Sequence, residues 1–213
     1  GGFPAIAYTD ETSGDLKYVR ATNAQGSAWG PPVVAAVGGA NVVGSWCSMA
    51  VVSGNPAIAY HDATNLDLKY VRANDATGAV WGAPVTVASH ATNSLGAGCV
   101  LRYVIQSVSV RRPVIAYLDA TAGTVRFKSG TNSDGTAWGA EQTPAPSLTT
   151  LDDGTGFDFE AAGGGLTLAY YNPAAGQAEY VTSSSVLGGT WTSPVVLGNA
   201  DVYDQTADVD IFQ

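Results

Sequence analysis

One interval recurs four times in this chain of 213 residues: a tyrosine is followed 21 positions later by a tryptophan. The four pairs are Tyr8 and Trp29, Tyr60 and Trp81, Tyr117 and Trp138, and Tyr170 and Trp191. The tyrosines are 52, 57 and 53 positions apart, so only the stretches between the copies vary in length. A period of about 50 residues indicates an array of supersecondary units.

The second copy shows what one unit contains. Residues 56–60 and 68–72 each alternate side chains in the two-residue period of a strand, and turn residues separate them. A third short strand, 84–87, begins with a proline, which suits an outer edge. The segment before residues 56–60, residues 48–52, supplies a fourth strand. Each unit is therefore predicted to be a four-stranded antiparallel meander.

The order of strands along the chain predicts how the units join. The chain starts on the second strand of one unit and ends on a first strand, 207–212, which can pair with residues 3–8. This pairing would leave no sheet edge open. We expect an all-β fold, a four-bladed β-propeller of four-stranded antiparallel blades, closed by the C-terminal strand on the N-terminal segment. An open solenoid is the alternative, but it needs distinct capping units.

The whole chain, residues 1–213, is expected to form one domain. Its repeats are approximately 2–53, 54–110, 111–163 and 164–213. The net charge of −9, with nine lysines and arginines and no basic stripe, argues against nucleic acid and anionic membrane partners. No apolar run approaches the roughly 20 residues of a membrane-spanning helix, so membrane insertion is not expected.

The two cysteines, Cys47 and Cys99, precede the second and third copies at corresponding places. They form either a disulfide or two buried free thiols; the sequence leaves both open. Neither has a second cysteine or a histidine at metal-ligand spacing. Low lysine content, one methionine and, if it forms, the disulfide favour an extracellular or cell-surface location.

The stretch before each tryptophan carries a resemblance to known families. Residues 23–29, 74–81 and 132–138 look like degenerate Asp-boxes, the turns of sialidase-type propellers, and Gly-x-x-Trp holds in all four copies. The unit also resembles the PAIAYxD…DLKYVR repeats of secreted bacterial β-propeller proteins. The resemblance implies the propeller fold and assigns no single activity.

A glycosidase needs two carboxylates with separated environments around one bond. The candidate pairs, Asp152 with Asp153 and Asp158 with Glu160, show no reason in the sequence to differ in pKa. A sialidase would also need an arginine triad, whereas Arg20 and Arg72 recur at one repeat position. The sequence therefore predicts a protein that is not an enzyme and requires no cofactor.

The remaining features predict recognition. Trp46 is the one tryptophan outside the repeat register, and the longer stretch 89–103 contains His90, Arg102 and Tyr103. Loops and aromatic side chains on a rigid scaffold suit ligand binding. We expect an extracellular, lectin-like module that binds a glycan or cell-surface polymer through these four residues. A structural or adhesive surface protein that self-associates is the alternative, and a glycosidase is a third.

Four carboxylates predict either a metal site or an ion-paired surface. Asp158 and Glu160 alternate on one first strand, and Asp208 and Asp210 alternate on another. Near the central channel they offer oxygen ligands of the kind Ca²⁺ prefers. The alternative is that they lie in water or pair with Arg111 and Arg112.

Overall fold

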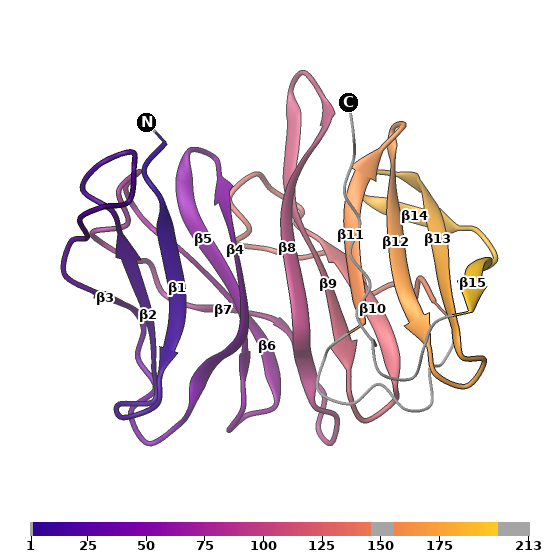
Figure 1. Ribbon diagram of the computed structural model, residues 1–213, viewed down its shortest axis with the longest axis horizontal. Coiled ribbons are helices and arrows are strands. Elements are labelled where there is room, and N and C mark those ends of the chain that lie inside the picture. Colours follow the sequence, from indigo (N-terminus) through magenta and orange to yellow (C-terminus); the bar gives the residue numbers. More distant parts are fainter. Residues whose placement is uncertain (1, 146–155, 200–213) are drawn as a thin grey trace.

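The computed structural model describes residues 2–145 and 156–199, and within these ranges it contains strands and no helix. Four separate antiparallel sheets follow one another along the chain (Figure 1). Among the described residues no helix is long and apolar enough to cross a membrane.

The first two sheets match two predicted units. The first sheet has three strands: β1 (Ala5–Asp10), β2 (Asp15–Arg20) and β3 (Val33–Ala36). The second sheet has the complete set of four in sequence order: β4 (Val43–Val52), β5 (Asn55–Asp62), β6 (Asp67–Arg72) and β7 (Val85–Ala88).

The other two sheets begin with the same strand order but depart from the predicted four strands, since the third has three strands and the fourth has five. The third contains β8 (Leu95–Ser107), β9 (Val110–Asp119) and β10 (Thr124–Ser129). The fourth contains β11 (Phe157–Ala162), β12 (Gly165–Asn172), β13 (Gln177–Ser185), β14 (Gly188–Trp191) and β15 (Val195–Asn199), the last of which pairs with β13. The predicted all-β, antiparallel architecture is confirmed.

Position in the array decides how deeply a strand is buried. Ile58 and Tyr60 on β5 are 0% and 2% exposed because the second sheet packs between two neighbours. Their counterparts on β1, Ile6 and Tyr8, are 49% and 36% exposed. One face of the first sheet is therefore uncovered by the described residues.

Edge-to-face aromatic contacts join successive units. Tyr18 contacts Trp81 at 5.2 Å between ring centroids, and Tyr70 contacts Trp138 at 5.4 Å. Phe127 contacts Trp191 in the same way at 5.5 Å. Each contact joins an aromatic residue on β2, β6 or β10 to the repeat tryptophan of the next unit, so these tryptophans pack between successive units.

The glycine of Gly-x-x-Trp serves the same contacts. Gly78 has φ +76°, and a Cβ there would lie 2.4 Å from the ring of Tyr18. Gly135 has φ +73°, and a Cβ there would lie 2.7 Å from the ring of Tyr70. Only glycine permits both this backbone conformation and so close an approach.

The Asp-box-like loops are closed by their own side chains. Asp75 accepts hydrogen bonds from the backbone N–H groups of Thr77 and Val80, both at 2.8 Å. The hydroxyl of Thr77 also donates to this carboxylate, and these bonds hold the pKa of Asp75 well below its usual value. The loops therefore act as structural turns.

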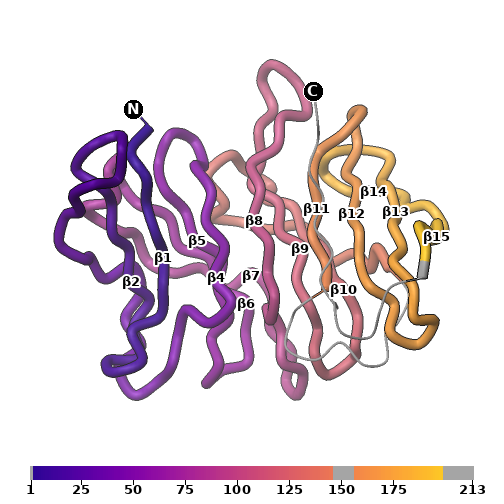
Figure 2. Tube along the Cα trace, viewed as in Figure 1, coloured from indigo at the N-terminus to yellow at the C-terminus, as the bar shows by residue number. Residues whose placement is uncertain are grey.

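The first strands of the last three units, β4, β8 and β11, lie next to one another in the middle of the array (Figure 2). The first and fourth sheets stand at its two ends (Figure 1). The strand predicted to join those ends, 207–212, lies outside the described residues, so the number of blades and the closure stay predictions.

Candidate functional site

Trp46 has an unusual backbone conformation. It lies in a bulge of β4, where the register with β5 shifts between Ser45 and Ser48, and its φ is +47°. A non-glycine residue in this region costs about 1–3 kcal/mol. The counterpart of Trp46 in the third unit is a glycine, Gly98, with φ +58°. The chain thus keeps a large side chain where its own repeat uses glycine.

The indole of Trp46 is held in place although it is 43% exposed. It packs against the imidazole of His61, with ring centroids 5.5 Å apart. His61 is 3% exposed, and its Nδ1 lies 2.7 Å from the carbonyl oxygen of Leu95. The bulge thus presents an aromatic face on a fixed support. His61 is not among the predicted site residues, although it is the one histidine directly after a repeat tyrosine.

Both cysteines lie beside this bulge. The thiol of Cys99 donates to the carbonyl oxygen of Trp46 at 2.9 Å, and that of Cys47 donates to Ala7 at 3.5 Å. Burial raises the pKa of both thiols, and for Cys99 the neighbouring Cys47 adds to the shift. Both are free in this structure, so the disulfide has no support here.

Three charged side chains meet between the first strands of the third and fourth units. Arg102 on β8 donates from Nε to Glu160 at 2.5 Å and from Nη2 to Asp158 at 3.1 Å. Its guanidinium also lies 5.8 Å from the Phe159 ring centroid. The pairing expected with Arg111 or Arg112 is thus made by Arg102.

The described residues hold no group of three or more histidine, cysteine or acidic side chains suited to a metal ion. Asp158 and Glu160, two of the four predicted ligands, share the cation of Arg102. The other two, Asp208 and Asp210, lie outside the described residues, as do Asp152 and Asp153. The channel Ca²⁺ therefore stays a prediction.

The four predicted ligand-binding residues do not form one cluster. His90 is exposed in the loop between β7 and β8. The hydroxyl of Tyr103 lies 2.9 Å from Ser53 Oγ. Tyr103 is four residues beyond Cys99 on β8, roughly 13 Å at about 3.3 Å per residue, whereas Cys99 contacts Trp46. The structure therefore has two separate clusters. One consists of Trp46 and His61, and the other consists of Arg102 with Asp158 and Glu160.

The extra length of the third unit lies elsewhere than expected. Nine positions separate Cys47 from Pro56, and fourteen separate Cys99 from Pro113. These five additional residues lengthen the hairpin of β8 and β9, which projects beyond its neighbours in Figure 1. The stretch 89–103, predicted to hold the insertion, therefore holds only part of this hairpin.

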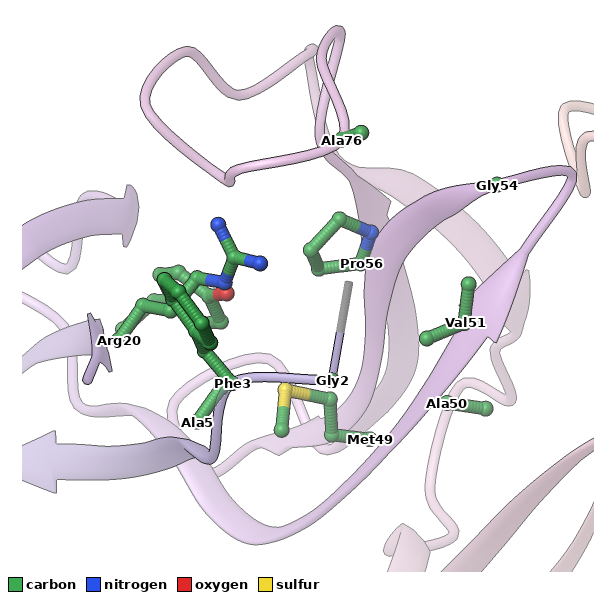
Figure 3. A pocket seen from close by; sticks show the side chains of 11 residues that line it. Gly2, Phe3, Ala5, Arg20, Met49, Ala50, Val51, Gly54, Pro56 and Ala76 are labelled. Carbon is green, nitrogen blue, oxygen red and sulfur yellow. The ribbon is translucent and has the colours of Figure 1, made fainter. Parts of the chain in front are cut away.

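A groove of about 420 Å³ separates the first sheet from the second (Figure 3). Arg20 and Phe3 line it on one side, with the guanidinium 5.1 Å from the ring centroid. Met49 and Pro56 line the other side. Tyr18 also contributes, and burial raises the pKa of its hydroxyl. The groove is thus largely apolar with one cation.

No protein-family model and no curated protein matches the chain in sequence. Its fold resembles that of an exo-β-1,3-galactanase from Clostridium thermocellum, with a TM-score of 0.58 and 11% identity over 95% of this chain and 48% of that one. A GH43 β-1,3-galactosidase gives a TM-score of 0.61 and 10% identity over 97% and 46%. The chain thus spans about half the length of these two enzymes.

A fucose-specific lectin from Aleuria aurantia is also similar, with a TM-score of 0.51 and 10% identity over 94% of this chain and 63% of that one. These neighbours are β-propellers, so the predicted fold is confirmed at that level.

The prediction that the chain is not an enzyme is contradicted by these neighbours, because most of them are glycoside hydrolases. The reasoning behind it was also incomplete. It rested on motifs along the chain, whereas charged residues on different first strands, such as Arg102 on β8 and Glu160 on β11, come together only in the fold.

Proposed function

We propose that this protein binds carbohydrate, with the indole of Trp46 as the platform on which a sugar ring stacks. One observation carries the proposal: an exposed tryptophan is kept in a left-handed conformation and fixed against a buried histidine. Strain of this kind persists where the surroundings enforce it, often at functional sites. A platform fixed before binding also loses little side-chain entropy when the ligand arrives.

The chemistry of the chain favours a neutral glycan. A flat indole suits the apolar face of a pyranose, and the net charge of −9 disfavours polyanions. The similar folds of a fucose-specific lectin and of galactan-directed hydrolases support a glycan as the partner. An extracellular location is part of the same proposal.

The four sheets are proposed to act as one propeller domain that spans the chain, with four blades. The three aromatic contacts between successive units support it, because each repeats the same geometry. Closure by pairing of residues 207–212 with the first sheet belongs to the same proposal.

Glycoside hydrolysis is the second candidate function. Asp158 and Glu160 stand on one first strand beside Arg102, in a fold shared with hydrolases. In that case the carboxylates would act on a sugar held in the channel, and Trp46 would bind a further part of the same chain of sugars.

A glycan array with the purified protein tests the binding proposal, with Trp46→Ala as the variant. Trp29→Ala is the matched control, because Trp29 is also exposed, at 40%, but belongs to the repeat register. We expect glycan signal from the parent and the control, and none from Trp46→Ala. An empty array with concentration-dependent assembly on a sizing column would instead favour the structural alternative. Release of reducing sugar from β-1,3-galactan, lost in Asp158→Asn and Glu160→Gln, would support hydrolysis.

A further inference from the structure

The projecting hairpin of the third unit, residues 104–112, presents apolar side chains to solvent (Figure 2). Ile105 is 57% exposed, and Val108 at the tip is 99% exposed. The ladder of β8 and β9 continues to this tip, where Ser107 lies opposite Val110. A two-stranded hairpin that extends beyond its sheet adds little stability of its own. The extra length is therefore better explained by contact with a partner than by folding.

The projecting hairpin also concentrates positive charge. Arg111 and Arg112 are adjacent on β9, and neither forms an ion pair with a residue that the structure describes. They lie opposite Ile105 and Val104 in the ladder, so alternation places them on opposite faces of the hairpin. In a chain with net charge −9, two adjacent cations without a carboxylate partner suit an acidic partner surface.

A surface of complementary character lies at one end of the first sheet. The loop between β3 and β4 leaves Val37 76% exposed and Val42 45% exposed. This loop packs on the turn between β1 and β2: the N–H of Gly38 donates to Asp15 Oδ1 at 2.8 Å, and a Cβ at Gly14 would lie 3.7 Å from the Cα of Val42. The two valines thus stand beside that turn.

Carboxylates make this end of the first sheet acidic. Asp10 and Asp15 flank the turn and share the ammonium of Lys17, at 3.5 Å and 3.9 Å. Glu11, in the turn itself, is exposed and forms no ion pair with a described residue. Three carboxylates against one lysine leave a negative charge. We call these carboxylates, together with Val37 and Val42, the acidic patch.

We propose that the projecting hairpin of one copy of this chain docks on the acidic patch of a second copy. Val108 and Ile105 contact Val37 and Val42, and the two arginines of the hairpin pair with the carboxylates of the turn. The hairpin tip and the turn after β1 lie at opposite edges of the molecule (Figure 1). The contact is therefore head to tail, and each copy offers its hairpin to one neighbour and its patch to another. Contacts of this kind build rings or linear arrays.

Sedimentation velocity of the full chain over a concentration series tests the docking. We expect the parent to assemble as its concentration rises. Val108→Asp and Val37→Asp should each raise the concentration needed for assembly by at least about tenfold, because a carboxylate in an apolar contact loses its hydration. Val51→Asp is the matched control, since Val51 is 64% exposed on the shorter hairpin of the second unit. It should assemble as the parent does.

A mixture of the two variants tests the head-to-tail arrangement. Val108→Asp keeps an intact patch and Val37→Asp keeps an intact hairpin, so each pair of unlike chains retains one complete contact. We expect heterodimers in the mixture and no larger species. All three substituted valines are exposed, so the variants should fold.

Three results would overturn the proposal: a parent that stays monomeric throughout, assembly that persists in both variants, or a mixture without heterodimers. Vesicles of phosphatidylcholine with phosphatidylglycerol provide a further arm. Their binding by a monomeric parent, lost in Val108→Asp, would assign the hairpin to a lipid surface instead of a second copy. The docking does not depend on glycan binding, so Trp46→Ala should assemble as the parent does.

Discussion

The imidazole of His61 supports the indole of Trp46, with ring centroids 5.5 Å apart, and its own orientation is set by the carbonyl oxygen of Leu95. We predict that His61→Ala lowers glycan affinity by about tenfold, because a mobile indole must be immobilised on binding at about 0.5–1.5 kcal/mol. His61→Phe keeps an aromatic support and should bind more tightly than His61→Ala. Titration calorimetry with the best ligand of the array measures both, and equal affinity in all three proteins would remove the role of His61.

The contact between Gly78 and Tyr18 allows a matched test of unit packing. Gly78→Ala strains the backbone and drives a Cβ toward the ring, whereas Gly54→Ala adds strain only, because nothing lies within 4 Å of a Cβ there. Both glycines have positive φ. Gly78→Ala should therefore be less stable than Gly54→Ala by about 1–3 kcal/mol, the usual cost of overpacking. Denaturant unfolding measures the difference. Equal midpoints would mean that the contact between the two units accommodates the added methyl group at no cost in stability.

Asp75 gives a pH dependence of known sign. Its pKa is lowered in the folded protein, first by the Thr77 hydroxyl and then by backbone N–H groups. The stability that it contributes is thus present above its unfolded pKa of about 3.9 and declines as the pH falls below it. In Asp75→Asn the melting temperature should fall relative to the parent at pH 7, and less so at pH 3. A difference that is the same at both pH values would contradict this account of the loop.

Arg102 compensates Asp158 and Glu160 between the third and fourth units. Arg102→Gln should destabilise the protein by about 1–3 kcal/mol at pH 7, because two partly buried carboxylates lose their cation. Urea unfolding of the parent and the variant at pH 7 measures the loss, and equal midpoints would contradict this role of Arg102. Melting curves of the parent with EDTA and with added Ca²⁺ test the separate prediction of a channel ion, which must stabilise the folded state if it binds.

Much of the fold could be predicted because the same sequence pattern occurs in four copies. The strands, their antiparallel order and the turns all follow from alternation and from the Tyr and Trp spacing. The difference in burial between β1 and β5 could not be predicted, because both strands contain the sequence Ala-Ile-Ala-Tyr. Only their neighbours in space decide how deeply each is buried.

The candidate site was only partly predictable. Trp46 stood out because it departs from the repeat. His61 also differs from the residues that follow the other repeat tyrosines, but nothing in the sequence placed it next to Trp46. The pairing of Arg102 with Asp158 and Glu160 joins residues 56 and 58 positions apart, which only the neighbouring first strands bring together. The prediction that the chain is not an enzyme also rested on sequence motifs alone, and it is contradicted by the fold that the chain shares with glycoside hydrolases.

The most direct test of glycan recognition at Trp46 compares Trp46→Gly with Trp46→Ala. At an ordinary strand position glycine is less stable than alanine by about 0.5–1 kcal/mol. With φ +47° the order should reverse. The account predicts that the glycine variant melts above the alanine variant, by roughly 2–4 °C per kcal/mol for a domain of this size, while neither retains glycan binding. Glycan binding that survives in either variant would contradict it.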